Sequence, residues 1–153
     1  MTTASPLRIE RATRADLLSV YRIESASFAE PWPYAAFERF LSEPGFLVAR
    51  EGDAVVGYVV ADSVPNHGRP IGHVKDIAVH PEYRERGIGR DLLARALGAL
   101  AAAGCARVKL EVRVGNAAAR SLYRRFGFEP QRQVPGYYQD GETAIVMVCA
   151  LGR

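Results

Sequence analysis

The segment Arg84–Gly89 combines residue types that can bind an anion. It follows the apolar run Ile77–Val79 and precedes a stretch whose apolar residues recur at helical spacing. Gly87 and Gly89 place no side chain between the backbone and a ligand. The free N–H groups and the positive dipole end of the following helix would point at that ligand. Because the GxxxxGK(S/T) and GxGxxG nucleotide patterns are absent, we predict an anion site of a different kind.

Three polar residues further along stand where acid–base chemistry is possible. Glu111 interrupts an apolar strand pattern, Asn116 is placed as a helix N-cap, and Tyr123 follows Asn116 by two helical turns. Each has an ordinary alternative, namely a solvent-facing carboxylate of an edge strand, a plain N-cap, and a core aromatic. A carboxylate can accept a proton and a phenol can donate one. Glu111 and Tyr123 are therefore the candidate catalytic residues.

The elements that would position these residues alternate between strands and helices. Strands are expected at Leu7–Arg11, Phe46–Arg50, Ala54–Asp62, Ile71–Val79, Arg107–Arg113 and Thr143–Leu151. Helices are expected from a Thr13 N-cap to about Phe28, at Tyr34–Leu41, from Ile88 to a Gly104 cap, and at Asn116–Phe126, with Gln131–Glu142 as a loop. Together they predict an α/β (α+β) fold in which helices flank a mixed sheet.

Composition limits the class of protein. The 153 residues suit a single domain, and 48% hydrophobic with 24% charged residues is typical of a globular protein. No apolar segment approaches the roughly 20 residues of a membrane helix, and Met1–Pro6 lacks the features of a secretory signal. We therefore expect a cytoplasmic protein that does not bind a membrane.

Cysteines, histidines and net charge exclude further classes. Cys105 and Cys149 lie in or beside apolar runs and read as core residues, and the three histidines form no metal-ligand pattern, so no metal is expected. The net charge of +3 comes from arginines interleaved with acids rather than from a basic face. Direct binding of nucleic acid is therefore not expected.

The two constellations together resemble a known family. Residues 77–89 follow I-A-V-x-P-x-x-R-x-x-G-x-G, and residues 111–128 follow E-x-x-x-x-N-x-x-A-x-x-L-Y-x-x-x-G-F. These patterns resemble the GNAT acyl-CoA N-acyltransferases, and in particular the RimI and Ard-type protein N-terminal acetyltransferases. The resemblance runs from about Leu7 to Val148 and includes the aromatic segments Phe28–Trp32 and Tyr137–Tyr138. It implies six to seven strands, about four helices, and acyl-CoA bound in a splay between two parallel central strands of one domain, residues 1–153.

The resemblance also implies roles for individual residues. Acetyl-CoA would be bound by the backbone of the strand end and by the turn after it, with Asn116 and Tyr123 in addition. Those residues are Ile77, Ala78, Val79, Arg84, Glu85, Arg86, Gly87, Ile88, Gly89 and Arg90. The acceptor would be contacted by Phe28, Trp32, His73, Tyr137 and Tyr138, and more loosely by Glu30.

The implied reaction transfers acetyl from acetyl-CoA to an N-terminal α-amino group, with a protein or peptide, for example a ribosomal protein, as acceptor. Glu111 would remove the amine proton through a water, and Tyr123 would protonate the departing thiolate. The pKa of an α-amino group, about 8, is roughly 2.5 units below that of lysine, so a modest base suffices. A small amine as acceptor and a non-catalytic acyl-CoA sensor are the alternatives. One departure is that Lys75 and Asp76 stand where apolar or small residues are more usual.

Overall fold

The computed structural model describes residues 7–152. The segment Met1–Pro6, which carries the prediction that no secretory signal is present, lies outside the described residues. A mixed sheet of seven strands forms the centre, in the order β1-β2-β3-β4-β5-β7-β6. Its strands are β1 (Leu7–Arg11), β2 (Leu47–Glu51), β3 (Ala54–Val64), β4 (Ile71–Val79), β5 (Arg107–Arg113), β6 (Glu129–Val134) and β7 (Ala144–Ala150). Neighbouring strands run antiparallel except β4 and β5, which are parallel. The expected mixed sheet is confirmed.

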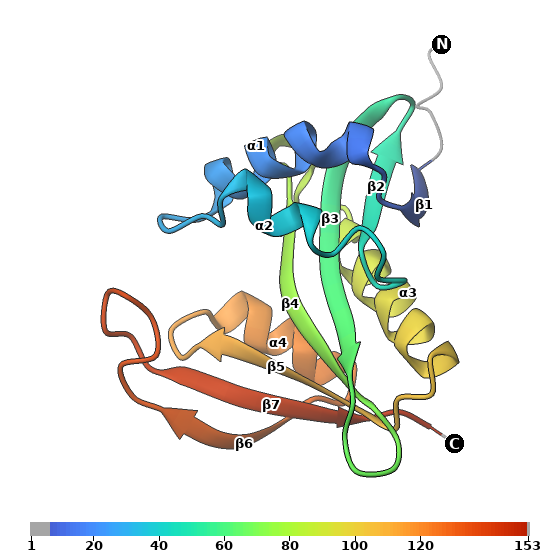
Figure 1. Ribbon diagram of the computed structural model, residues 1–153. Coiled ribbons are helices and arrows are strands. Elements are labelled where there is room, and N and C mark those ends of the chain that lie inside the picture. The colour runs from blue at the N-terminus through green and yellow to red at the C-terminus, as the bar shows by residue number, and fades with distance from the viewer. Residues whose placement is uncertain (1–6, 153) are drawn as a thin grey trace.

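Two helical layers cover the sheet, one on each face (Figure 1). Between residues 7 and 152 the α-helices are α1 (Leu17–Ser27), α2 (Tyr34–Glu38), α3 (Ile88–Ala102) and α4 (Ala117–Arg125). Apolar residues of α1 and α2 pack with Tyr58, Val60 and Ala78 in one core cluster. Those of α3 and α4 pack in a larger cluster on the opposite face. Within this described range, no helix has the length and apolar content to cross a membrane.

Local sequence signals explain where the helices begin and end. The side-chain oxygen of Asn116 accepts a hydrogen bond from the Ala119 N–H at 3.1 Å, which confirms it as the N-cap of α4. Gly104 follows α3 with φ +95°, a conformation that favours glycine. Helix α1 begins later than expected, because Thr13 opens a 3-10 turn (Arg14–Asp16) before the α-helix starts at Leu17.

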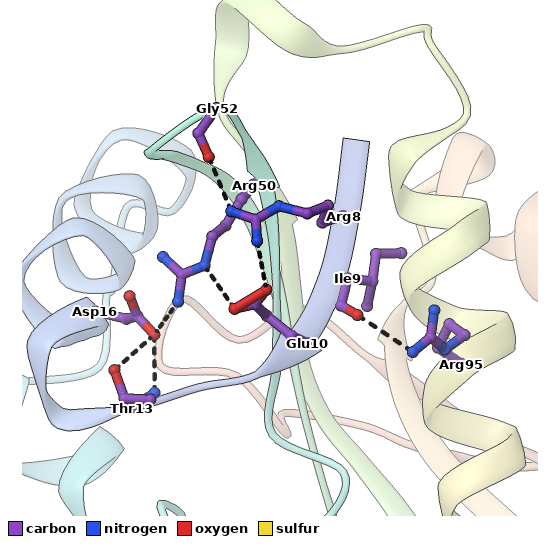
Figure 2. Close-up of polar contacts among 8 residues, drawn as sticks. All are labelled: Arg8, Ile9, Glu10, Thr13, Asp16, Arg50, Gly52 and Arg95. Atoms are coloured by element: carbon purple, nitrogen blue, oxygen red, sulfur yellow. Dashed lines mark hydrogen bonds and ion pairs between the residues drawn. The ribbon is translucent and has the colours of Figure 1, made fainter. Parts of the chain in front are cut away.

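The N-terminal strand is held to the rest of the sheet by charged side chains (Figure 2). Arg50 of β2 lies between two carboxylates, with Nη2 2.7 Å from Asp16 and Nε 3.1 Å from Glu10. Burial opposes ionisation of Asp16, but hydrogen bonds from Arg50 and Thr13 outweigh it and lower the pKa of this carboxyl. Arg50 thereby fastens β1 and the start of α1 to β2.

One expectation about the sheet was wrong. Residues 129–134 form strand β6, although most of them were expected to be loop. This strand pairs only with β7, carries a bulge after Pro130 and has almost entirely exposed side chains, so it lacks the apolar alternation that reveals a strand. The alternative that Glu111 is a solvent-facing carboxylate of an edge strand does not hold, because β5 lies between β4 and β7 and Glu111 is half-buried.

Candidate active site

The parallel strands β4 and β5 separate soon after they meet. They pair only over Ile71–His73 and Arg107–Lys109. Beyond these residues β4 pairs with β3 alone, and β5 pairs with β7 alone. The sheet therefore opens into a fork whose two inner edges leave backbone groups free to bind an extended ligand. The end of β4 leads directly from the fork into the segment Arg84–Gly89.

The turn that precedes α3 is held open by its backbone conformation. Glu85 and Gly87 have positive φ values, 64° and 81°. Among the residues that the structure describes, Glu85 is the one residue other than glycine with a positive φ. Holding a non-glycine residue there costs about 1 kcal/mol or more, which is typical of a functional turn. Arg84 stabilises the turn through two hydrogen bonds. Its Nε donates to the Val79 carbonyl at 3.0 Å, and its Nη2 donates to the Ser27 hydroxyl at 3.2 Å. The Arg90 side chain lies close to Gly87, where an added Cβ would meet its Nη2 at 2.8 Å, whereas an added Cβ at Gly89 would meet only Val79.

Packing within the protein does not explain the glycine at position 89. A Cβ at this position would meet only the Val79 side chain, at an ordinary 3.8 Å. The protein interior therefore does not require glycine there. Helix α3 is 15 residues long, so its dipole and free N–H groups favour an anion beside Gly89. A ligand that approaches the backbone closely is the simplest reason for a glycine.

His73 and Glu111 form a hydrogen-bonded pair where the strands begin to separate. His73 Nε2 lies 2.7 Å from Glu111 Oε1, and both side chains are mostly buried. The hydrogen bond from His73 is the main cause that lowers the Glu111 pKa; burial opposes it, and Lys109 and Lys75 add to it. Glu111 is therefore ionised at neutral pH and available to accept a proton.

The only two lysines of the chain flank this pair. Lys75 Nζ lies 3.3 Å from His73 Nδ1, and Lys109 Nζ lies 3.7 Å from Glu111 Oε2. An ammonium group can donate but cannot accept, so the Nδ1 of His73 acts as the acceptor. The proton of a neutral His73 then resides on Nε2 and points at Glu111. This arrangement makes Glu111, rather than His73, the group with a free lone pair.

Tyr123 approaches the fork from the other face of the sheet. Leu110 and Val112 point into the cluster formed by α3 and α4, so Glu111 between them points to the opposite face. Tyr123 belongs to that same cluster, and its ring packs edge-on against Phe128 at 5.8 Å. Burial first, and then the charge of Asp76, raise the pKa of Tyr123. The phenol therefore keeps its proton well beyond neutral pH.

Arg113 connects the two loops that border the α1–α2 face of the fork. Its Nη1 lies 2.9 Å from both Asp140 and Glu142 in the β6–β7 loop, and its Nη2 lies 3.6 Å from Glu30 in the α1–α2 loop. The guanidinium also stands over the ring of Tyr138, 4.0 Å from its centroid. The acids of both loops are therefore paired with one arginine.

Aromatic side chains occupy the same two loops. Tyr137 is half exposed and its ring meets Tyr138 edge-on at 5.0 Å. The negative charge of Glu111 contributes, after burial, to raising the pKa of both phenols, that of Tyr138 to about 12. Phe28 is exposed, whereas Trp32 packs inward against Phe37 and Phe40 at 5.2 and 5.7 Å. Trp32, one of the predicted acceptor-binding residues, therefore also stabilises the α1–α2 loop.

Comparison with known sequences decides the family. Residues 17–128 match the profile of the acetyltransferase (GNAT) family, and these residues include the fork, the turn and the Glu111 pair. The chain is a GNAT acetyltransferase. As such it is an acetyl-CoA-dependent N-acetyltransferase.

Several relatives of this GNAT protein are named N-alpha-acetyltransferases. It is 42% identical to the N-alpha-acetyltransferase RimI of Mycobacterium tuberculosis over 150 residues, which cover 93% of this chain and 91% of the relative. It is 36% identical to an N-alpha-acetyltransferase of Sulfolobus acidocaldarius, with 94% and 92% covered. The structure of the ribosomal-protein-S18-alanine N-acetyltransferase of Escherichia coli superposes with a TM-score of 0.85 at 29% identity, covering 97% and 96%.

The residues of the GNAT fork suit acetyl-CoA. The open turn at Gly87 and Gly89 and the start of α3 would hold the pyrophosphate, as the close approach allowed by Gly89 indicates. The free inner edge of β4 at Ile77–Val79 would bind the pantetheine arm through backbone hydrogen bonds. When bound, acetyl-CoA supplies the activated acetyl group. The roles of these individual residues, and of the remaining turn residues and Asn116, stay predictions.

Sequence reasoning left the orientation of Lys75 and Asp76 open. The β3–β4 register shifts here, because Val60 pairs with Asp76 while Ala61 pairs with Val74, so Lys75 is the extra residue of a β-bulge. Both side chains consequently lie on the α1–α2 face, Lys75 towards His73 and Asp76 towards Tyr58. A bulge is not readable from the residue types alone.

A buried group of acids also escaped the sequence analysis. Glu24 of α1 is 2% exposed, and Tyr58 of β3 is fully buried and donates a hydrogen bond to it. The Tyr58 hydroxyl also lies 3.4 Å from Asp76 Oδ2. A signal existed: Glu24 falls on the same helical row as Leu17 and Val20, both completely buried.

Asp76 should make stability depend on pH. Burial of its carboxyl, followed by contact with Glu24, raises its pKa well above the usual value, while Tyr58 and Ile77 act the other way. The folded protein therefore keeps a proton that the unfolded chain releases above about pH 4. The corresponding stabilisation is complete below that pH and is lost as the pH rises towards the folded-state pKa, by up to about 1.4 kcal/mol per unit.

Asp76→Asn removes this titration and keeps a neutral side chain of similar shape. We expect the variant to lose less stability than the wild type between pH 5 and pH 9. Urea unfolding at several pH values measures the difference. Parallel stability curves for the two proteins would contradict the assignment of the extra proton to Asp76.

Proposed function

We propose that this GNAT enzyme acetylates the N-terminal α-amino group of proteins or peptides. The observation that carries the proposal is the His73–Glu111 pair, 2.7 Å apart, where the fork begins and beside two aromatic loops. The activities named for the mycobacterial and archaeal relatives support the same acceptor class. Peptides that begin with Ala or Ser are the first candidates, and an N-terminus of a ribosomal protein is one natural source.

The mechanism follows from the protonation states at the fork. Ionised Glu111 takes a proton from the acceptor ammonium through a water, and His73 holds Glu111 in place with its Nε2–H. The amine nitrogen then bonds to the acetyl carbon. Backbone N–H groups of β4 at Ile77–Val79 stabilise the negative oxygen that develops. As the carbon–sulfur bond breaks, Tyr123 gives its proton to the thiolate, and the second proton of the attacking nitrogen passes through the water to bulk solvent. Glu111 then releases its proton to solvent, and the Tyr123 phenolate takes one back.

The charges of the loops argue against a polyamine or aminoglycoside acceptor. A polycation requires several carboxylates that are free to pair with it. Glu30, Asp140 and Glu142 are all engaged by Arg113, and Lys75 and Lys109 add positive charge beside Glu111. A single α-ammonium group needs only one acceptor of its proton, which Glu111 provides.

The acceptor class can be tested with matched amines. With acetyl-CoA at pH 7, a peptide with a free N-terminal Ala or Ser should react about 300-fold faster than the same peptide with a blocked N-terminus and one lysine, because its amine is neutral roughly 300 times more often. Mass spectrometry measures the products, with spermidine as a third acceptor. Spermidine or an aminoglycoside outcompeting every peptide would contradict the proposal and favour the small-amine alternative.

Removal of the Tyr138 ring should affect the binding of the peptide but not the binding of acetyl-CoA. Tyr138→Ala should raise the KM for the peptide about tenfold, the effect of losing roughly 1.4 kcal/mol of contact, and should change the KM for acetyl-CoA little. Initial rates with each substrate varied in turn give both constants. Tyr34→Ala is the control, since Tyr34 is an exposed tyrosine on α2 that packs only against Tyr21 among the described aromatic residues. Equal effects of the two variants would contradict a role of Tyr138 in acceptor binding.

A further inference from the structure

Glu24 forms hydrogen bonds to both ends of the loop segment that carries Phe28 and Trp32, two of the residues predicted to contact the acceptor. The backbone carbonyl of Glu24 accepts a hydrogen bond from the Phe28 N–H at 3.1 Å, which ends α1. Its side chain extends past the helix end, and Oε2 accepts a hydrogen bond from the Trp32 N–H at 2.8 Å. One residue thus fixes both ends of segment 28–32. A buried carboxylate that binds a loop backbone is a costly arrangement unless its remaining lone pairs are satisfied.

The sheet supplies the remaining partners of Glu24. Tyr58 of β3 donates its hydroxyl to Glu24 Oε1, and Asp76 of β4 lies close enough to this hydroxyl and to Glu24 to raise its own pKa. Two carboxylates in such contact cannot both be charged without a large penalty. Burial and this contact raise the pKa of Asp76, so Asp76 keeps its proton to higher pH than a free aspartic acid does. Glu24 accepts the hydrogen bonds from Trp32 and Tyr58.

The same residues connect the loop to the reacting centre. Asp76 directly precedes Ile77, the first of the backbone positions that would bind the pantetheine arm. Arg84 joins the end of α1 to the anion-binding turn through Ser27. Helix α1, the acceptor loop and the strand edge at the fork are therefore parts of one bonded unit.

We propose that Glu24, Tyr58 and Asp76 form a buried cluster that positions the α1–α2 loop for the acceptor, so that Glu24 is a positioning residue for acceptor binding. The proposal rests on the proposed function only for the identity of the acceptor. A cluster that holds the loop should affect acceptor affinity through the backbone at Trp32. It should leave the binding of acetyl-CoA nearly unchanged, because neither Glu24 nor Trp32 is among the residues predicted to contact acetyl-CoA.

The chain contains a built-in probe of this loop, because Trp32 is its only tryptophan. In the wild type the indole packs between Phe37 and Phe40. Glu24→Ala removes the acceptor of the Trp32 N–H and leaves that group unpaired. We expect Trp32 emission to shift to longer wavelength with increased acrylamide quenching, and the KM for the peptide to rise about tenfold, while the KM for acetyl-CoA changes less than twofold.

Two further variants keep the test independent of general damage. Glu24→Gln retains an oxygen for the Trp32 N–H and should restore most of the emission and most of the acceptor KM. Tyr58→Phe keeps the ring against Phe37, 5.8 Å away, and removes only the hydroxyl, so it should give a smaller change in the same direction. Glu38→Gln, which neutralises an exposed acid of α2 paired with Arg14, is the control and should change neither readout.

The outcomes separate this proposal from the proposed function. A folded Glu24→Ala protein with wild-type Trp32 emission and wild-type acceptor KM would overturn the cluster's role. So would a parallel rise in the KM values for acetyl-CoA and acceptor, or a failure of Glu24→Gln to restore either readout. The emission experiment needs no acceptor turnover. It therefore tests the cluster even if a small amine proves to be the true acceptor, and the KM is then measured with that amine.

Discussion

Glu111→Gln should reduce turnover by about 10² to 10⁴-fold at neutral pH, the range typical of a lost general base. Glutamine retains the shape of the side chain and an oxygen for the Nε2–H of His73, which lies 2.7 Å away in the wild type. The effect should be largest near pH 6 and smaller at pH 9, because an α-amino group with a pKa of about 8 is already mostly neutral at the higher pH. Measurement of kcat from pH 6 to 9 shows this convergence.

The control for Glu111→Gln is Glu129→Gln, which neutralises an exposed acid on β6. It should leave kcat unchanged. Since hydrogen bonding to His73 keeps Glu111 ionised throughout this range, the wild-type pH profile should follow the acceptor amine alone. A Glu111→Gln enzyme with full activity at every pH would leave positioning of the substrates as the source of catalysis, and the assignment of Glu111 as base would be withdrawn.

Tyr123→Phe tests the other face of the fork. The variant keeps the ring against Phe128 and removes only the proton donor. We expect kcat to fall with little change in the affinity for acetyl-CoA, and the loss should be constant from pH 6 to 9 because the buried phenol stays protonated there. Single-turnover rates measure the chemical step. Wild-type rates in this variant would contradict protonation of the thiolate by Tyr123.

Gly89→Val should weaken acetyl-CoA binding by about 10² to 10⁴-fold. The valine side chain would occupy the space in which the pyrophosphate meets the N–H groups of α3. Losing two hydrogen bonds to a charged group, at about 1.5 to 3 kcal/mol each, corresponds to that range of affinity. The fold should persist, since a Cβ at Gly89 meets only Val79 at 3.8 Å. Isothermal titration calorimetry with acetyl-CoA measures the change.

Gly98→Val is the matched control for this experiment. Gly98 lies in the same helix, and a Cβ there would meet no atom within 4 Å. Both substitutions replace a helical glycine with valine, so their effects on helix propensity are similar. Only Gly89→Val should lose affinity. Unchanged acetyl-CoA affinity in that variant would show that the ligand does not approach the start of α3.

Local sequence was sufficient for the elements that carry the anion site. The apolar row of α3, the glycines at its start and Gly104 after its end are determined within about twenty residues of chain, as helix signals generally are. The same holds for the Asn116 cap of α4. These features depend on backbone conformation and helical periodicity, and the structure reproduces them. The two motifs were thus enough to predict the fold class.

Strand β6 could not be predicted in this way. Its residues, Glu129–Val134, are nearly all exposed, so no apolar pattern records the strand, and it exists because β7 offers a free edge. The bulge at Lys75 is similar, since it results from the register between β3 and β4 and not from the residues of β4. Only pairing between distant segments determines such features.

The sequence by itself was sufficient to predict an anion-binding turn, the candidate acid–base residues Glu111 and Tyr123, and the aromatic loops. Tertiary structure alone decided their partners. His73 lies 38 residues from Glu111 along the chain and Glu24 lies 34 residues from Tyr58, separations at which neither residue spacing nor charge pattern specifies a contact. The protonation states that permit chemistry, an ionised Glu111 and a protonated Tyr123, arise from burial and from the neighbouring groups. They exist only in the folded protein, because folding brings the groups together and removes the water around them.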